Sequence, residues 1–146
     1  MARFEPWLMY GLIGCIAFGI NIIVLKLSFK AGINPFMASA FFNLGAFLVS
    51  ALAFLIFRQQ PSGTASGVLL AVLAGAVWSV GLVSVSYGIS QNFEVSKMSV
   101  IINSNTVIAV LLSIIVLKEL QNPSDLWRTL LGAILVVGGA IIVSVR

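Results

Sequence analysis

The sequence predicts an all-α integral membrane protein with five transmembrane helices. Of its 146 residues, 60% are hydrophobic and 8% are charged, whereas about 25% charged residues are typical of a soluble domain. The apolar residues fall in long runs, and a run of about 20 such residues is what a helix needs to cross a bilayer. The scarcity of charge and the length of these runs together exclude a soluble globular domain.

Five apolar segments are separated by polar connections that contain turn-forming residues. The connections read KAGINP, RQQPSGTAS, SQNFE and KELQNPSD, and their Pro, Gly, Asn and Ser are typical of turns. The predicted helices cover about residues 7–27, 35–57, 67–89, 95–117 and 127–145. Because every connection is short, neighbouring helices are expected to run antiparallel, and residues 1–146 are expected to form a single transmembrane domain.

Local signals support the helices in turn. The first segment follows one arginine and has no small-residue cleavage site, so we interpret it as a retained helix and not as a signal peptide. Pro35 suits the first turn of the second helix, and Ser124 is a candidate N-cap for the fifth. Small residues spaced along the first, third and fifth helices predict close packing. These stripes are Gly11, Cys15 and Gly19; Gly67, Ala71, Gly75 and Ser79; and Gly132–Ala140.

Basic residues are divided evenly between the two membrane surfaces. We call the surface of the N-terminus side A and the opposite surface side B. Side A holds Arg3, Arg58, Lys118 and Arg128, and side B holds Lys26, Lys30, Lys97 and Arg146. The excess of Lys and Arg that normally marks the cytoplasmic side is therefore missing. Two interpretations are open: the charges are too few to orient the chain, or copies insert both ways and pair as an inverted dimer.

Several classes of function are disfavoured by residues that the sequence lacks. It has no His and a single cysteine, Cys15, which excludes His/Cys metal sites, Cys–His catalysis and internal disulfides. The basic residues form no stripe, so no nucleic-acid partner is expected. Glu5, Glu94, Glu119 and Asp125 all lie at segment ends, which disfavours proton coupling through an intramembrane carboxylate unless Glu94 is drawn inward. We expect no enzyme activity, no cofactor and no metal.

Polar residues gather at similar depths on several helices. With a rise of about 1.5 Å per residue, Asn21, Asn43, Ser84, Tyr87 and Asn103 fall between the midplane and side B, and Trp78 and Thr106 fall near the midplane. The candidate substrate-binding residues are Asn21, Lys26, Asn43, Trp78, Tyr87, Asn103, Asn105 and Thr106. A cavity open to side B would have this lining. The alternative is that these groups only hydrogen-bond between helices, which we favour for the serines.

The stretch VIINSNTVIAV, residues 100–110, is the most unusual in the chain, because it places four polar side chains inside the fourth predicted helix. Asn103 and Asn105 are two residues apart, so their amides point to different faces and both need buried partners or water. We interpret them as part of a site. For Lys26 two interpretations are open: its side chain extends to the interface, or its charge attracts an anionic solute at the cavity mouth.

The end of the chain resembles an EamA domain of the drug/metabolite transporter superfamily. The stretch TVIAVLLSIIVLKELQNPSDLWRTLLGAILVVGGAIIV (residues 106–143) has the order of that pattern: an apolar helix ending in Lys118-Glu119, a polar turn, and a last helix with Gly132-Ala133 and Gly139. AGAVWSVGLVSVSYGIS (residues 74–90) resembles the third helix of the family, and INIIVLKL (residues 20–27) the lysine-bearing end of the first. The resemblance covers nearly the whole chain.

The resemblance implies one half of an inverted-repeat transporter, because the family commonly joins two five-helix halves. A second five-helix unit, as a homodimer and possibly inverted, is then the expected partner. The family often has a proline in the fourth helix where this chain has NSNT, so amide side chains take the place of carbonyls that a proline frees. The chain also lacks the first-helix glutamate of the four-helix multidrug-resistance type.

We therefore expect a multi-pass protein of the inner or plasma membrane. It would transport a small polar metabolite or drug-like solute by alternating access, through facilitated diffusion or exchange. Two alternatives are kept. A lipid-carrier flippase subunit would have a groove open to lipid. A non-transporting accessory protein would have polar side chains that all pair with one another and leave no water-accessible volume.

Overall fold

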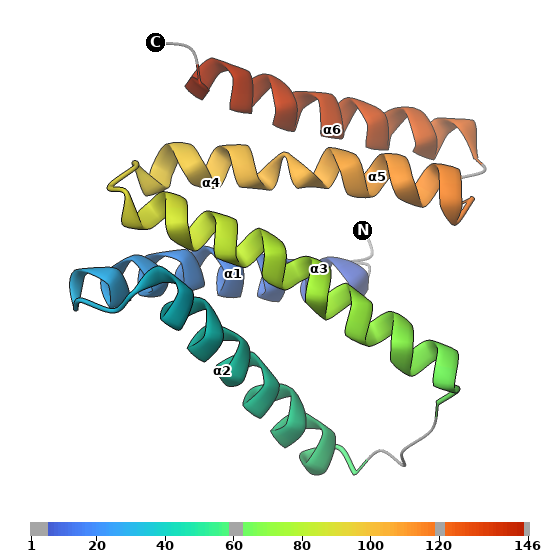
Figure 1. Cartoon of the computed structure of the whole chain (residues 1–146). Coiled ribbons are helices and arrows are strands. Elements are labelled where there is room, and N and C mark those ends of the chain that lie inside the picture. The colour runs from blue at the N-terminus through green and yellow to red at the C-terminus, as the bar shows by residue number, and fades with distance from the viewer. Residues whose placement is uncertain (1–5, 59–62, 119–121, 145–146) are drawn as a thin grey trace. The chain divides into compact units, whose positions relative to one another are not determined.

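The computed structural model describes residues 6–58, 63–118 and 122–144, which form six helices and no strand. Their bounds are α1 (Pro6–Lys30), α2 (Pro35–Ile56), α3 (Ala65–Ser90), α4 (Val95–Asn103), α5 (Asn105–Val116) and α6 (Pro123–Ser144) (Figure 1). The predicted last residue of the fifth span, 145, and the acidic residues Glu5 and Glu119 lie outside these ranges.

Five stretches are long and apolar enough to cross a membrane, which confirms the predicted fold class. Four of them correspond to α1, α2, α3 and α6, and the fifth runs from Val95 through α4 and α5 to Val116. The chain divides into two compact units, residues 1–93 with α1–α3 and residues 94–146 with α4–α6. We call them unit 1 and unit 2 and describe each by itself. The single domain over residues 1–146 stays a prediction.

Helix starts and turns follow from local chemistry. Pro35 begins α2 as predicted, and the Asn34 side chain accepts a hydrogen bond from the Phe36 N–H at 2.9 Å. Gly32 has φ +93° in the preceding turn, a backbone conformation that favours glycine. The predicted N-cap at Ser124 is wrong. Asn122 accepts from the Ser124 N–H at 3.3 Å, because the helix begins one residue earlier than Ser124, at Pro123.

Unit 1 is packed at one end only. The buried residues among its described positions all lie near the C-terminal ends of α1 and α3 or the start of α2. They are Leu25, Ala38, Ser39, Leu82, Ser86, Gly88 and Ile89. Toward its C-terminal end, α2 diverges from the other two helices of the unit (Figure 1). In the predicted topology this packed end lies at side B. The helices of unit 1 are therefore less closely packed toward side A.

Two serines join α2 to α3 inside this packed end. The hydroxyl oxygens of Ser39 and Ser86 are 2.9 Å apart and hydrogen-bonded, and these residues are 2% and 0% exposed. Ser39 also bonds to the Pro35 carbonyl oxygen at 2.9 Å. Other serines of the unit bond to carbonyls of their own helix, for example Ser79 to Gly75 at 2.8 Å, and so do not connect helices. Among the described serines of unit 1, only this pair forms a hydrogen bond between helices.

Unit 2 consists of a broken span that packs on α6 (Figure 1). Both α4 and α5 contact α6, and the buried residues of α6 are Ala133 and Ala140. They are seven residues apart, so they lie on one face of the helix. Both belong to the predicted small-residue patch Gly132–Ala140. A Cβ atom added at Gly132, Gly138 or Gly139 would meet nothing within 4 Å, so the packing is made at the two alanines and not at the glycines.

The serine pair makes a measurable prediction about stability. In a double-mutant cycle of Ser39→Ala and Ser86→Ala, we expect a coupling free energy of about 0.6 kcal/mol, the usual size of a hydrogen bond between membrane helices. Steric trapping or SDS titration followed by circular dichroism measures it. The control cycle pairs Ser39→Ala with Ser79→Ala and should be additive. An additive result for Ser39 and Ser86 as well would contradict the assignment.

Candidate functional site

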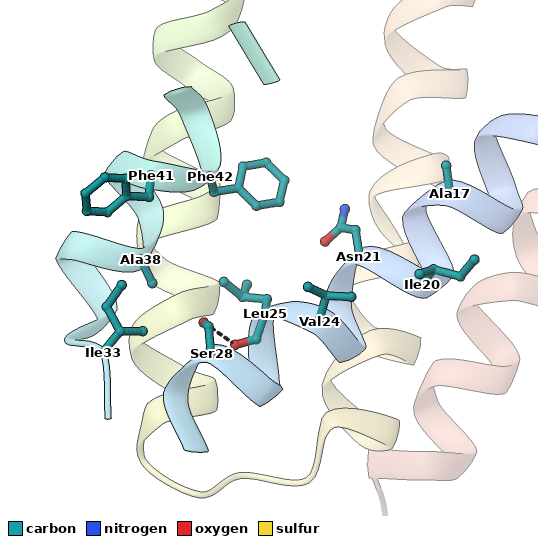
Figure 2. A pocket seen from close by; sticks show the side chains of 10 residues that line it. All are labelled: Ala17, Ile20, Asn21, Val24, Leu25, Ser28, Ile33, Ala38, Phe41 and Phe42. Atoms are coloured by element: carbon teal, nitrogen blue, oxygen red, sulfur yellow. Dashed lines mark hydrogen bonds between the residues drawn. The ribbon is translucent and has the colours of Figure 1, made fainter. Parts of the chain in front are cut away.

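An open groove lies between α1 and α2 in unit 1, and it has a volume of about 620 Å³. Its lining comes from the C-terminal half of α1, the turn that follows, and the first part of α2 (Figure 2). The lining residues are Ala17, Ile20, Asn21, Val24, Leu25, Ser28, Ile33, Ala38, Phe41 and Phe42. The groove exists because α1 and α2 are joined by a tight turn and separate beyond it.

The groove is apolar apart from two side chains. The Ser28 hydroxyl donates to the Leu25 carbonyl oxygen at 2.7 Å, so its proton is already used. Within the described residues, no hydrogen bond engages the Asn21 amide, which has two donors and an acceptor oxygen to offer. Figure 2 shows this amide and the Phe42 ring directed toward the space between the helices. Asn21 is thus the polar group that a bound molecule meets.

Lys26 does not extend freely toward water. Its Nζ donates a hydrogen bond to the carbonyl oxygen of Ile89 at 3.0 Å, and Ile89 is fully buried. Ile89 lies in the last turn of α3, where carbonyl groups lack helical N–H partners and the helix dipole favours a positive charge. Lys26 therefore links α1 to the end of α3, a role that neither sequence interpretation included.

The predicted aromatic residues are paired with phenylalanines of unit 1. The ring centroids of Trp78 and Phe18 are 6.3 Å apart, and those of Tyr87 and Phe36 are 6.2 Å apart, both in tilted arrangements. These distances are typical of favourable aromatic pairs. Trp78 is 51% exposed and Tyr87 is 52% exposed, so about half of each residue stays accessible. Neither ring lines the groove.

The remaining predicted residues lie elsewhere on the helices. Asn43 is half-buried on α2, beyond the groove lining. Asn103, Asn105 and Thr106 are exposed residues of unit 2. In the part of the chain that the structure describes, no hydrogen bond engages these four side chains. Of the eight predicted residues, Asn21 is the one that lines the groove. That all eight form one binding site stays a prediction.

The fourth span runs from Val95 to Val116, close to the predicted 95–117, and is interrupted at Ser104, whose φ of −66° and ψ of −11° stay in the right-handed helical region. The Ser104 N–H bonds to the Ile101 carbonyl and the Val107 N–H bonds to the Ser104 carbonyl, both at 3.1 Å. Each bond spans three residues, the tighter spacing of a 3₁₀ turn. The physical reason lies in the side chains: Ser and Asn compete for backbone groups, and the Ser104 hydroxyl lies 3.4 Å from the Val100 carbonyl oxygen.

Glu94 lies at the surface end of this span and is not drawn inward. Its carboxylate is 2.8 Å from the Lys97 ammonium, and the side chains are 62% and 47% exposed. Such an exposed pair contributes little to stability. The arrangement supplies no acidic group to the interior of the span.

Sequence reasoning missed some residues that shape the site. Ser86 was not singled out, although it lies seven residues after Ser79 and so continues the small-residue stripe of α3. Phe42 was also missed, and nothing in a run of apolar residues distinguishes it. The partner of Lys26 is a backbone carbonyl, which leaves no trace in the sequence.

Comparison with models of known protein families gives a match over nearly the whole chain. A family model described as "EamA-like transporter family" matches residues 5–145, nearly the whole chain. None of the curated proteins and none of the solved structures compared with the chain matches it.

The Lys26 contact predicts a difference between two neighbouring lysines. Lys26→Met should lower the free energy of unfolding by about 1 kcal/mol, because α3 loses a cation at its C-terminal end. Lys30→Met is the matched control and should have little effect, since Lys30 is exposed. Thermal unfolding in detergent measures both. Equal melting temperatures for the two variants would show that the Lys26 contact contributes no stability.

Proposed function

The chain belongs to the EamA-like transporter family, and we propose that it carries a small polar metabolite or drug-like solute across a membrane by alternating access. The family match over residues 5–145 is the observation that carries this proposal. Five membrane-length apolar stretches agree with it, since they make the chain a multi-pass membrane protein. We place it in the inner or plasma membrane, and no cofactor or nucleic acid takes part.

The broken fourth span supports a solute path through unit 2. Irregular backbone at membrane depth is tolerated where it is buried in protein or lines a water-filled cavity. Transporters commonly place substrate sites at such interruptions of a helix. We assign Asn103, Asn105 and Thr106 to the path, where amides and a hydroxyl replace part of the hydration shell of the solute.

In unit 1 we assign five further residues of the predicted set to solute binding. Asn21 lies in the groove, and Asn43, Lys26, Trp78 and Tyr87 complete the assigned set. Helices pinned at one end by Ser39, Ser86 and Lys26 are suited to move as a body. In our proposal, rocking of such bodies exposes the solute to each membrane face in turn.

A second copy of the chain is part of the proposal. The family commonly joins two five-helix halves in one transporter. A functional transporter built from this five-helix unit therefore needs a partner unit. We propose a homodimer, whose copies are inverted if the even distribution of Lys and Arg reflects insertion in both orientations.

A lipid-carrier flippase subunit is the second candidate function. The apolar lining and the open form of the α1–α2 groove favour it. Reconstitution with a fluorescent lipid distinguishes the two functions, because a flippase moves the lipid between leaflets and a solute transporter does not.

Asn103→Leu and Asn105→Leu should each slow transport about tenfold, the effect of losing about 1.4 kcal/mol of hydrogen bonding to the solute. Proteoliposomes are loaded with a ¹³C-labelled metabolite extract, and mass spectrometry follows the compounds that leave. Gln91→Leu, which removes an exposed amide from the end of α3, is the control. Wild-type rates in both asparagine variants, with folding confirmed by circular dichroism, would remove these residues from the path.

The dimer has its own test. Multi-angle light scattering of the detergent-solubilised protein, corrected for bound detergent, should give a protein mass of twice 15.5 kDa. A mass of 15.5 kDa at all concentrations would contradict the dimer and leave transport by a single unit to be explained.

A further inference from the structure

The groove between α1 and α2 has a lining that selects against charge. Of the ten lining residues none is ionisable, and the only polar side chains are those of Asn21 and Ser28. The Ser28 proton is used by the Leu25 carbonyl. The ammonium of Lys26 is not part of the lining and donates to the Ile89 carbonyl. A charged group entering this groove would lose part of its hydration and find no counter-ion among the lining residues, which is unfavourable.

The number of hydrogen-bonding groups limits the bound molecule further. Asn21 offers one amide, whose N–H donors and acceptor oxygen lie together and so match one compact polar group. A sugar or a zwitterionic amino acid carries polar groups spread over the molecule, and most of them would stay unpaired against Ile20, Val24 and Leu25. Each unpaired buried group costs free energy. The groove therefore fits a molecule with one hydrogen-bonding group on an otherwise apolar body.

The depth of Asn21 distinguishes such a solute from a bilayer lipid. Asn21 lies well inside α1, about 14 Å from Lys30 at a rise of about 1.5 Å per residue. Lipid polar groups stay near the interface, while the hydrocarbon core is about 30 Å thick. An acyl chain in the groove would face the Asn21 amide with methylene groups and leave it without a partner.

The Phe42 ring indicates the shape of the apolar body. It is directed into the same space as the Asn21 amide (Figure 2), and Phe41 also belongs to the lining. Aromatic rings pair favourably in offset or edge-to-face arrangements. A volume of about 620 Å³ is within the range of pockets for drug-sized ligands, about 300–1,000 Å³.

We propose that the α1–α2 groove binds an uncharged aromatic solute with one hydrogen-bonding group, held by the Asn21 amide and the Phe42 ring. This assignment deepens the proposed function by naming a class of solute, and it rests on that function only for passage across the membrane. Binding itself is independent of transport. An uncharged solute of this kind also needs no counter-ion on its way through the span.

The test uses 5-fluoroindole, which has an aromatic body and one N–H donor, with the full chain in lipid nanodiscs. ¹⁹F NMR should show line broadening beyond that in empty nanodiscs, and unlabelled indole should reverse it. Tryptophan carries the same ring with a zwitterionic head and should not compete. Broadening equal to that in empty nanodiscs, or equal competition by tryptophan, would overturn the proposal.

Variants locate the binding in the groove. Asn21→Leu should weaken the apparent affinity for 5-fluoroindole about tenfold, in line with a lost hydrogen bond, and Phe42→Leu should weaken it severalfold. Gln91→Leu, which removes an amide outside the groove, should match the wild type. If Asn21→Leu does not fold, the apparent affinities of Phe42→Leu and Asn21→Ser for 5-fluoroindole test the assignment instead. Wild-type affinity in the folded groove variants would overturn the assignment.

The two proposals fail separately. Asn21-dependent binding without any transport in proteoliposomes would leave the groove assignment standing and contradict the transporter function. Suppose instead that transport depends on Asn103 while substitution of Asn21 or Phe42 leaves 5-fluoroindole binding unchanged. That result would support the transporter function and contradict the groove assignment.

Discussion

The buried contact between Ser39 and Ser86 is the interaction on which the arrangement of unit 1 depends. Lipid tails are as apolar as leucine, so helices in a bilayer are not driven together by the hydrophobic effect. They need small residues for close approach and polar groups to join them. Unit 1 concentrates both at one end, where Ala38 and Gly88 accompany the serine pair and Lys26 adds the link to α1. Away from that end α2 diverges from α1, and the groove between them begins beyond the turn that joins the two helices.

In unit 2 the governing constraint is the satisfaction of backbone groups. Hydrocarbon offers no hydrogen bonds, so an interruption of a helix must be repaired locally. Bonds spanning three residues at Ser104 do this on both sides of the break. The span keeps its direction as α4 and α5 and still packs on α6 through small residues. Among the described residues, no hydrogen bond engages the amides of Asn103 and Asn105, which flank the break.

The sequence predicted the features that depend on composition and on local chemistry. Long apolar runs located the five spans, and Pro35 marked the start of α2 as expected. It could not predict the break at Ser104, because a stretch such as NSNT is compatible with a continuous helix when apolar residues flank it. Asn122 was overlooked as the cap of α6, since Ser124 has an equally suitable side chain and only the position of Pro123 decides between them.

The candidate site was harder to predict than the fold for a physical reason. Depth along a helix follows from residue number, which brought Asn21 into the predicted set, and Asn21 does line the groove. The direction of a side chain around the helix depends on how neighbouring helices tilt, so Asn43 at a similar depth lies outside the lining. Contacts with backbone carbonyls, such as that of Lys26 with Ile89, have no side-chain partner that a sequence pattern can reveal.

The Lys26 contact has a consequence for how the chain enters the membrane during synthesis. Its two partners are 63 residues apart, so α1 leaves the ribosome well before the carbonyl that accepts its ammonium exists. During that interval the lysine must stay hydrated near the interface, which holds the new α1 at a shallow position. α1 reaches its final depth only after α3 has been synthesised and inserted. The helices of unit 1 therefore assemble in order, and the contact from α3 fixes the position of α1.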